Sequence, residues 1–444
     1  MRGLSEMGPQ QVLAIRGGRV VCPATGRDEQ ADIYVRDGRI VATGAEEAPA
    51  PEAIIDARGQ VVCPGLIDLH VHLREPGAEQ KETIETGTRA AIRGGFTTVC
   101  AMPNTTPAPD APETVDAVNV RIRQSAWCRV GVIGAATAAN DRETLTDFVE
   151  LRDAGCVAIS DDAFMLRTLQ QRREALHRCA AAGLTFIAHA EDEELSAGGV
   201  MHDGDIAREL GAPGQHADAE VRSLEAWREA WDRPGSPPLH IAHLSTAASV
   251  EFLRDWRPGP TAETAPHYLA LTHAAVGERG ANAKMNPPLR TEHDRMALLQ
   301  AVSEGLVGVI ATDHAPHTSA EKSAGLTEAP FGIVGLETAL PVILDTLVGE
   351  AGLSLSEALA PLTGAPADLL GLAQGRIEVG APADLLVFDA DVHQTVDPTE
   401  FSSMGRNTPF AGCSLPGMVT AVVVGGQVAY GQDGFAGTRP KGLN

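Results

Sequence analysis

Apolar runs and helical segments alternate along the middle of the chain, from about residue 63 to residue 372. The apolar runs predict strands over 66–72, 97–104, 130–137, 156–162, 184–192, 239–245, 261–267 and 307–317. Between them lie segments rich in Ala, Leu, Glu and Arg that predict helices, for example 86–95, 173–183 and 219–231. Nearly continuous apolar strands separated by helices are typical of a parallel sheet with both faces covered. Eight such units predict an α/β fold, a closed TIM-like (β/α)8 barrel.

The two ends of the chain carry a different pattern. Both contain short segments in which apolar and polar positions alternate, with Gly or Asp at the turns. We therefore expect a small β-sandwich domain built from both termini. Its N-terminal part would be 1–62 and its C-terminal part 373–444, with the barrel over 63–372.

Composition and charge narrow the functional classes. The 444 residues include 35 basic and 59 acidic ones, a net charge of −24. Nucleic acids and anionic membrane surfaces attract basic proteins, so we expect neither as a partner. The seven cysteines form no CxxC pair, and neither a signal segment nor a membrane-spanning run is present. These features predict a cytoplasmic enzyme with free thiols.

Polar residues with catalytic or metal-binding chemistry stand where most of the predicted strands end. They are His70, His72, Asn104, Asp161, Asp162, His189, His243, His267 and Asp313. In a barrel of this kind the carboxyl ends of the strands form the active-site face. We therefore expect these residues to surround one cavity, although they lie far apart in the sequence.

The spacing of the first histidine pair suggests a metal site. His70 and His72 share one face of a strand, because side chains alternate along it. Two imidazoles on one face can bind a divalent metal, although hydrogen-bonded core histidines have the same spacing. His189 and His243, at two consecutive strand ends, are candidate ligands of a second metal. Asp313 at the last strand end can bind a metal and move a proton.

Two other histidines serve as a contrast. His177 lies within a helical segment and His240 lies early in its strand. We expect both to be structural.

Two adjacent metals need a negatively charged bridge. In many barrel hydrolases a carboxylated lysine on the fourth strand provides it, but this chain has no lysine between Lys81 and Lys284. The fourth predicted strand ends instead in Asp161 and Asp162. Strand neighbours point to opposite faces, so one of the two should reach the metals. We favour Asp162 and keep Asp161 as the alternative, with the other residue as an N-cap of the next helix.

Ordered motifs over nearly the whole chain resemble those of the amidohydrolase superfamily, and more narrowly those of the dihydroorotases. They are PGLIDLHVHLREPG (64–77), GGFTTVCAMPNTTP (94–107), GGVMHDGDIARELGAPG (198–214), HIAHLSTAASVE (240–251), TAETAPHYLALT (261–272), NPPLR (286–290), ATDHAPH (311–317), PFGIVGLET (330–338) and ADLLVFD (383–389). The Asp pair resembles the bacterial type that lacks the carboxylated lysine, which favours Asp162 as the bridge. Ala163 and Tyr268 depart from the pattern, where glycine and a second histidine are expected.

The resemblance implies the reversible, metal-dependent cyclisation of N-carbamoyl-L-aspartate to L-dihydroorotate in de novo pyrimidine biosynthesis. It implies one or two Zn²⁺ ions per subunit and favours a binuclear centre, although His and carboxylate ligands also suit Co²⁺ or Mn²⁺. Two metals about 3.5–4 Å apart can hold a hydroxide and polarise a carbonyl. Asp313 would act as general acid and base. The implied ligands are His70, His72 and Asp313 for one metal, His189 and His243 for the other, and Asp162 for both.

A substrate pocket is also implied. The Arg74 guanidinium can grip a carboxylate with two hydrogen bonds, although Glu75 beside it allows a structural ion pair. By resemblance the exocyclic carboxylate is held by Arg74, Asn104 and His317, and the ring amide is contacted by Asn286 and by Pro330, Phe331 and Gly332. For His317 a position on an ordinary surface loop is the alternative. The segment 314–335 is either a loop that closes over the substrate or an ordinary surface loop.

Two other functions fit parts of this pattern. One is a different cyclic-amide hydrolase, such as an allantoinase, a dihydropyrimidinase or a hydantoinase. The missing lysine and the set Arg74, Asn104 and His317 favour a dihydroorotase instead. The other is an inactive structural partner of aspartate transcarbamoylase, which would have lost metal ligands that this chain retains. We expect a small-molecule substrate. A homodimer and a complex with aspartate transcarbamoylase are both compatible with the sequence, and no feature of the sequence decides either.

Overall fold

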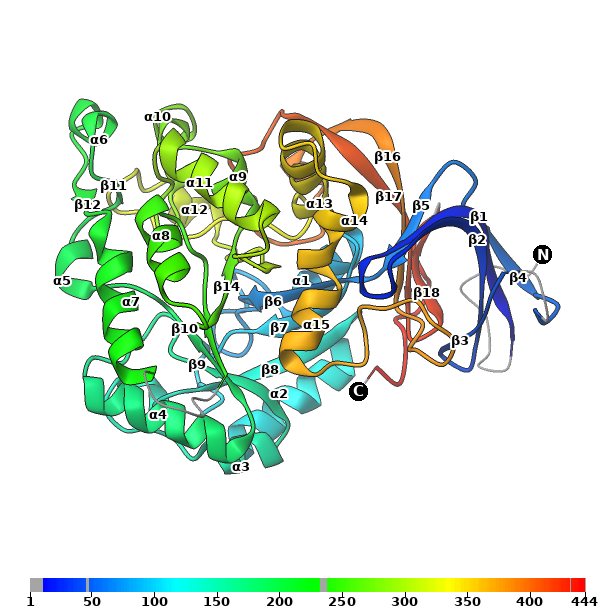
Figure 1. The fold of residues 1–444 in the computed structure, drawn as a ribbon, viewed down its shortest axis with the longest axis horizontal. Helices are drawn as coiled ribbons and strands as arrows, with labels where there is room; N and C mark the ends of the chain where they lie inside the picture. Colours follow the sequence, from blue (N-terminus) through cyan, green and yellow to red (C-terminus); the bar gives the residue numbers. More distant parts are fainter. Residues whose placement is uncertain (1–10, 45–47, 232–237, 432, 444) are drawn as a thin grey trace.

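Eight parallel strands form a nearly closed barrel, hydrogen-bonded in chain order (Figure 1). The computed structural model describes residues 11–44, 48–231, 238–431 and 433–443. The barrel strands are β6 (Leu66–Val71), β7 (Phe96–Ala101), β8 (Arg129–Ala135), β9 (Cys156–Ser160), β10 (Thr185–Ala188), β13 (Leu239–Ile241), β14 (Thr261–Thr264) and β15 (Val309–Ile310). Between the first and last strands, Val71 pairs with His314 and the His72 amide donates to the His314 carbonyl (2.9 Å). The predicted barrel is confirmed, with strands shorter than the apolar runs.

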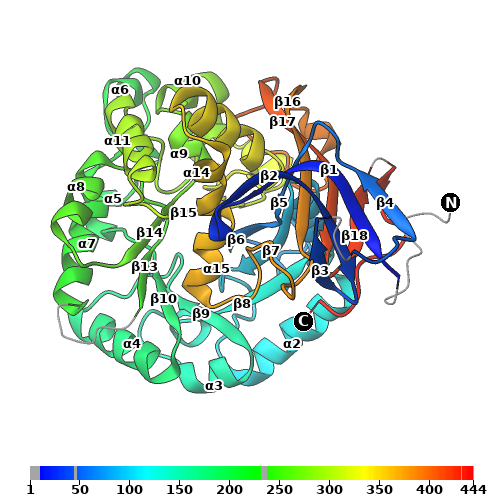
Figure 2. The ribbon, with the colours of Figure 1, turned by 45° about the vertical axis from the view of Figure 1, so that its right-hand side comes forward.

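Helices surround these strands on the outside (Figure 2). The longer ones are α1 (Ile84–Arg93), α2 (Pro112–Ser125), α4 (Leu169–Ala182), α7 (Asp218–Trp231), α8 (Ala247–Asp255) and α11 (Glu292–Ser303). Shorter ones are α3 (Phe148–Asp153), α5 (Glu193–Ser196), α6 (Asp205–Leu210), α9 (Pro266–Ala270), α10 (Ala274–Arg279), α12 (Ser319–Lys322), α13 (Ala339–Ile343), α14 (Leu355–Leu359) and α15 (Gly364–Leu370). Local sequence sets their ends. Helix α4, for example, begins after the capping hydroxyl of Thr168 and ends at Gly183, whose φ of 67° suits glycine.

Strands from both termini form a second sheet beside the barrel, on the right of Figure 1. They are β1 (Leu13–Cys22), β2 (Arg27–Arg36), β3 (Arg39–Thr43), β4 (Ala53–Asp56), β5 (Val61–Pro64), β16 (Leu385–Thr395), β17 (Ser414–Val424), β18 (Gln427–Gly431) and β19 (Gly434–Phe435). The two termini meet where β5 pairs antiparallel with β16. The expected terminal β domain is therefore present, and its nine strands are connected in one sheet. The proposed boundary between residues 62 and 63 falls within β5.

The terminal sheet packs on the barrel and also has a core of its own. Along β16, Leu385 and Val387 belong to the core of the sheet, whereas Leu386 and Phe388 belong to the large core around the barrel. Because successive side chains of a strand point to opposite faces, β16 contributes to both cores. Because β5 continues through Gly65 into β6, the sheet also anchors the first barrel strand.

Two further sequence predictions concern the cell compartment. All seven cysteines are free, and six of them are buried. No helix in the described part of the chain is both long and apolar enough to cross a membrane. The N-terminal segment used to predict the absence of a signal peptide, residues 1–10, lies outside the described residues.

Candidate metal centre and substrate pocket

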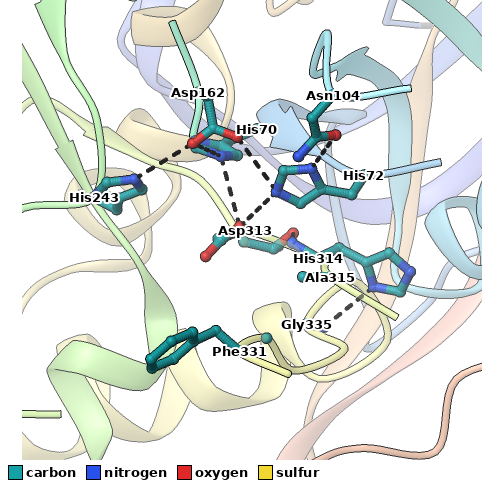
Figure 3. A network of polar contacts seen from close by, with 12 residues as sticks. His70, His72, Asn104, Asp162, His243, Asp313, His314, Ala315, Phe331 and Gly335 are labelled. Atoms are coloured by element: carbon teal, nitrogen blue, oxygen red, sulfur yellow. Dashed lines mark hydrogen bonds and ion pairs between the residues drawn. The ribbon is translucent and has the colours of Figure 1, made fainter. Parts of the chain in front are cut away.

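Side chains from five barrel strands meet in one buried cluster (Figure 3). His70 lies in β6 and His72 directly follows it. The other members each lie one to three residues past their strands: Asp162 after β9, His189 after β10, His243 after β13 and Asp313 after β15. The six side chains proposed as metal ligands are therefore brought together, as expected for carboxyl strand ends of a barrel.

Two ligand groups in this cluster share Asp162. His70, His72 and Asp162 form one group, and Asp162, His189 and His243 form the other. In each group the candidate ligand atoms lie within 4.8 Å of one another. Asp162 Oδ1 is 3.0 Å from His189 Nδ1 and 3.7 Å from His70 Nε2. The shared carboxylate stands where a bridge between two metals would be needed.

Asp161 has a different environment. One of its carboxylate oxygens accepts from the Leu166 amide (3.0 Å) and the other from the His189 amide (3.0 Å). Asp161 therefore ties the loop after β9 to the end of β10, and it belongs to neither ligand group.

The donor set fits divalent metal ions. Among the described residues, the buried His70 Nε2 and Asp162 Oδ2 have no hydrogen-bond partner, which is costly unless another group satisfies them. The opposite nitrogen of each of three imidazoles is held by an oxygen. His70 Nδ1 is 3.1 Å from Glu263, His72 Nδ1 is 3.0 Å from Asn104 and His189 Nε2 is 2.8 Å from Glu191. Such partners fix the tautomer in which the remaining nitrogen would be free to bind a metal.

Carboxylates and imidazoles shift one another's pKa in this cluster. Burial alone would raise the pKa of Asp162, but the charge of His70 and hydrogen bonds from His189 and His243 hold it well below its usual range. The neighbouring imidazoles likewise lower the pKa of Asp313 against the effect of burial. Burial opposes a charged His189, yet its hydrogen bonds to two carboxylates raise its pKa to about 10. The carboxylates therefore favour positive charge here, and a metal ion would replace the imidazole protons.

Asp313 contacts both histidines at the end of the first barrel strand with one carboxylate oxygen. Its Oδ1 is 3.0 Å from His72 Nε2 and 3.6 Å from His70 Nε2. In Figure 3 its second carboxylate oxygen points away from these two rings. One oxygen therefore faces the candidate ligands His72 and His70, and the other points away from them.

Sequence analysis missed two glutamates that support this centre. Glu263 in β14 binds His70 Nδ1 with one oxygen and His240 Nε2 (3.1 Å) with the other. Glu191 binds His189 with the oxygen that also accepts from the Asn286 side-chain amide (2.7 Å). Glu263 could have been predicted as a site residue, because an acidic side chain within a buried strand needs a partner. Nothing in the sequence distinguished Glu191.

The remaining strand-end and loop histidines have separate environments. His240, expected to be structural, binds Glu263 beneath the ligands, and His177 is exposed on α4. His314 points away from the cluster, and its Nδ1 accepts from the Gly335 amide (3.2 Å; Figure 3). His267 is buried at the start of α9, and its Nε2 has no partner among the described residues.

Arg74 and His317 lie beside each other next to the cluster. Arg74 Nη2 is 3.4 Å from His317 Nε2, and Arg74 Nε donates to the Pro316 carbonyl (3.3 Å). The expected alternative for Arg74, an ion pair with Glu75, is not formed, because Glu75 binds Arg121 (2.8 Å). His317 is buried and does not lie on an exposed loop.

Other predicted substrate contacts are already hydrogen-bonded within the protein. Asn104 faces His72, and the Asn286 side chain lies between Glu191 and Gln215. The Pro330 and Gly332 carbonyls accept from Lys322 Nζ (3.0 and 2.9 Å), and the Phe331 carbonyl faces His317 Nε2 (2.7 Å). At Gly332 a Cβ atom would lie 2.7 Å from that of Ala315, so only glycine fits. These contacts tie residues 330–332, within the segment 314–335, to Lys322 and His317.

Comparison with known proteins gives the family. A model described as Dihydro-orotase-like matches residues 59–222, and an amidohydrolase family model matches 213–430. The chain is 43% identical to the dihydroorotase of Pelotomaculum thermopropionicum over 423 residues, covering 94% of this chain and 98% of that protein. It is 44% identical to the dihydroorotase of Bacillus caldolyticus over 402 residues, covering 90% and 94%. The chain belongs to the dihydroorotase family.

Solved structures of other cyclic-amide hydrolases share the fold. The L-hydantoinase from Arthrobacter aurescens matches with a TM-score of 0.86 at 24% identity, covering 97% of this chain and 98% of that one. The dihydropyrimidinase from Brevibacillus agri matches with a TM-score of 0.82 at 24% identity, covering 96% and 97%. At this identity the matches support the barrel with its companion sheet and nothing finer.

One departure from the dihydroorotase pattern has a clear structural role. The Tyr268 hydroxyl donates to the Pro287 carbonyl (2.6 Å) and is buried. Tyr268, which stands at the position where the family pattern has a second histidine, therefore holds the backbone beside Asn286. For Ala163 nothing in the structure explains the departure from glycine.

Proposed function

We propose that this chain is a dihydroorotase that interconverts L-dihydroorotate and N-carbamoyl-L-aspartate by opening and closing a cyclic amide. The observation that carries the proposal is the pair Arg74 and His317, whose nitrogens lie 3.4 Å apart beside the two ligand groups that share Asp162. The pair suits a substrate with a carboxylate, and the ligand groups suit metal-assisted amide hydrolysis. The reaction would serve pyrimidine biosynthesis, and the free cysteines support a reducing compartment such as the cytoplasm.

Zn²⁺ is the proposed cofactor. The proposed ligands are His70, His72 and Asp313 for one ion, His189 and His243 for the other, and Asp162 for both. The unpartnered His70 Nε2 and Asp162 Oδ2 support this assignment, since both would gain a partner. When bound, the ions would lower the pKa of a water molecule and polarise the amide carbonyl.

Asp313 is the proposed proton carrier. Its low pKa keeps it ionised near neutral pH, so it can accept the proton of the attacking water. The oxygen turned away from His72 and His70, Oδ2, is the atom proposed to receive the proton. Asp313 would then give this proton to the leaving amide nitrogen. Ring closure would use the same group in the reverse order.

The substrate carboxylate would be bound by Arg74 and His317, with Asn104 nearby. Arg74 Nη2 and His317 Nε2 lie 3.4 Å apart, and a carboxylate oxygen placed beside them would accept from both, in competition with the Phe331 carbonyl at Nε2. Asn286 would contact the ring amide, because its side chain lies between the metal-side residue Glu191 and Gln215. The backbone around Phe331 would complete the pocket.

A substrate panel tests the proposal. Zinc-loaded protein is assayed on L-dihydroorotate, dihydrouracil, allantoin and hydantoin, and we expect ring opening of L-dihydroorotate alone. Arg74→Met should raise the KM for L-dihydroorotate by about 100-fold, because a charged bidentate hydrogen bond to the carboxylate is lost. Activity on a neutral ring alone would overturn the carboxylate pocket. Absence of activity on all four substrates with metal bound would overturn the proposed function and favour the structural-partner interpretation.

A further inference from the structure

The His317 ring faces a carbonyl oxygen at one nitrogen and an ammonium group at the other, and the Glu321 Oε2 atom, 3.8 Å from Nδ1, is too far away for a hydrogen bond. Its Nε2 lies 2.7 Å from the Phe331 carbonyl oxygen, which can only accept a hydrogen bond. Its Nδ1 lies 3.3 Å from Lys81 Nζ, an ammonium group that can only donate. The two contacts require the same tautomer, with the proton on Nε2 and the lone pair on Nδ1. Lys81 stands 236 residues from His317 in the chain.

We propose that Lys81 is a positioning residue for substrate recognition, which fixes His317 as an Nε2–H donor toward the substrate carboxylate. This inference rests on the proposed function, because the carboxylate is that of L-dihydroorotate. Lys81 would therefore contribute to selectivity for a ring with a carboxylate over a neutral ring.

Lys81 is itself held in place. Its ammonium forms an ion pair with Glu321 Oε1 (2.8 Å), and its side chain is only 19% exposed. The other oxygen of Glu321 accepts from the Thr318 amide (3.0 Å) and hydroxyl (2.9 Å), the capping box at the start of α12. The ammonium group is thus fixed on one side by α12 and directed at His317 on the other.

The position of Arg74 explains why this tautomer matters. Arg74 Nη2 lies 3.4 Å from His317 Nε2, and with Nε2 protonated both atoms are donors. A carboxylate oxygen between them would accept from both and would compete with the Phe331 carbonyl for the His317 proton. The opposite tautomer would direct a nitrogen lone pair at the carboxylate, which is repulsive.

Electrostatics favours the same state. Burial and the nearby charges of Arg74 and Lys81 lower the pKa of His317 to about 3. His317 is therefore neutral near neutral pH, and a neutral imidazole has only one N–H to offer. The Phe331 carbonyl favours the proton on Nε2, and the contact with Lys81 keeps the proton off Nδ1.

A double-mutant cycle tests whether Lys81 acts through His317. Lys81→Met, His317→Ala and the double variant are compared with wild type for kcat and KM on L-dihydroorotate with zinc bound. Lys81→Met should raise KM about tenfold and change kcat less than threefold, since a hydrogen bond to a charged group becomes misdirected. In the His317→Ala background the same substitution should change KM less than twofold.

Two further variants separate positioning from loss of charge. Lys81→Arg keeps a donor-only cation and should restore most of the wild-type KM. Lys441→Met removes the same charge from an exposed site near the C-terminus and should leave KM, kcat and thermal stability unchanged. Thermal unfolding of Lys81→Met should lie close to that of wild type.

The tautomer of His317 can also be determined by NMR spectroscopy, without an activity assay. In ¹⁵N-labelled protein, the His317 ring signals are identified by their loss in His317→Ala. We expect wild type to show a protonated Nε2 and an unprotonated Nδ1.

Additive KM effects in the cycle, or a wild-type His317 protonated on Nδ1, would overturn the role of Lys81 while the wild-type enzyme still opens L-dihydroorotate. A wild-type protein that does not turn over L-dihydroorotate would instead overturn the proposed function, and this inference with it.

Discussion

At the scale of single residues, the neighbours Asp161 and Asp162 have distinct environments. Asp161 accepts two backbone amides, and Asp162 faces three imidazoles. Both are buried carboxylates on one short loop, yet only Asp162 has an oxygen without a hydrogen-bond partner. The difference between them can be measured by separate substitutions.

Asp162→Asn should lower the bound metal to about one ion per chain or less, because an amide is a poor bridging ligand. The matched variant Asp161→Asn should keep most of the metal and lower the thermal midpoint instead, since an amide nitrogen would face a backbone donor. Metal content by atomic emission and thermal unfolding check both expectations. Equal metal loss in the two variants would contradict the assignment of Asp162 as the bridge.

Asp313→Asn tests the proton carrier. Because the amide cannot take the proton, kcat should fall by about 10³-fold or more. His70, His72 and Asp162 remain as ligands, so most of the bound metal should be retained. Stopped assays of ring opening, together with metal analysis of the same sample, give both numbers. Near-normal turnover would exclude Asp313 as the proton carrier.

At the scale of elements, the site depends on sharp turns directly after the strands. Arg74, His243 and Asp313 have φ values of 60°, 35° and 49°, a region that non-glycine residues seldom adopt. Each of the three is a proposed site residue that follows a barrel strand. Hydrogen bonds from neighbouring residues stabilise such backbone conformations. Next to His243, for example, the Leu244 amide donates to the Glu263 carbonyl (2.8 Å). The barrel therefore stabilises conformations that place functional side chains.

Another buried contact at this scale gives the stability a pH dependence. Glu337, just before α13, accepts the amides of Ser402 (2.9 Å) and Ser403 (3.2 Å) and joins the segment after β16 to the barrel. Burial raises its pKa from 4.5 to about 7. Between these values the folded protein holds a proton that the unfolded chain releases, so this contribution to stability decreases as pH rises from about 4.5 through 7.

Glu337→Gln, which carries no titrating group, should lose this dependence. The thermal midpoint of the variant minus that of wild type should increase from pH 5 to pH 8. Differential scanning calorimetry at both pH values measures the difference, with Glu304→Gln, at an exposed carboxylate, as the control. A difference that stays constant or decreases with pH would contradict the raised pKa.

At the scale of the whole molecule, the candidate metal centre lies inside a fold that has large apolar cores of its own. The core around the barrel and the core of the terminal sheet contain apolar side chains from both ends of the chain. The barrel fold should therefore not depend on metal ions, unlike small zinc domains that unfold without them.

Removal of metal should therefore abolish activity without unfolding the protein. After chelation we expect no ring opening, an unchanged far-ultraviolet circular dichroism spectrum and a thermal midpoint lower by several degrees, because metal binds only the folded state. Added Zn²⁺ should restore activity, and Co²⁺ or Mn²⁺ should restore part of it. Loss of the helical signal on chelation would show that the centre is needed for folding.

Local patterns were sufficient for much of the fold. The eight barrel strands lie within or next to the eight apolar runs, because burial on both faces leaves a continuous apolar segment. Their ends were identifiable from polar residues such as His189 and Asp313, and a barrel necessarily gathers strand ends at one face. The pairing of the two termini followed from their shared alternating pattern, but the single connected sheet did not.

The sequence by itself therefore determined the order of elements, the fold and the residue types at the site, because these depend on local periodicity and chain order. The tertiary structure decided which partners meet. Asp162 rather than Asp161 faces the imidazoles, Glu191 contacts both His189 and Asn286, and Lys81 contacts His317. Such contacts depend on the direction of each side chain after a strand and on loops that bring distant segments within about 3 Å. The periodicity of the sequence carries no information about these side-chain directions or about the paths of the loops.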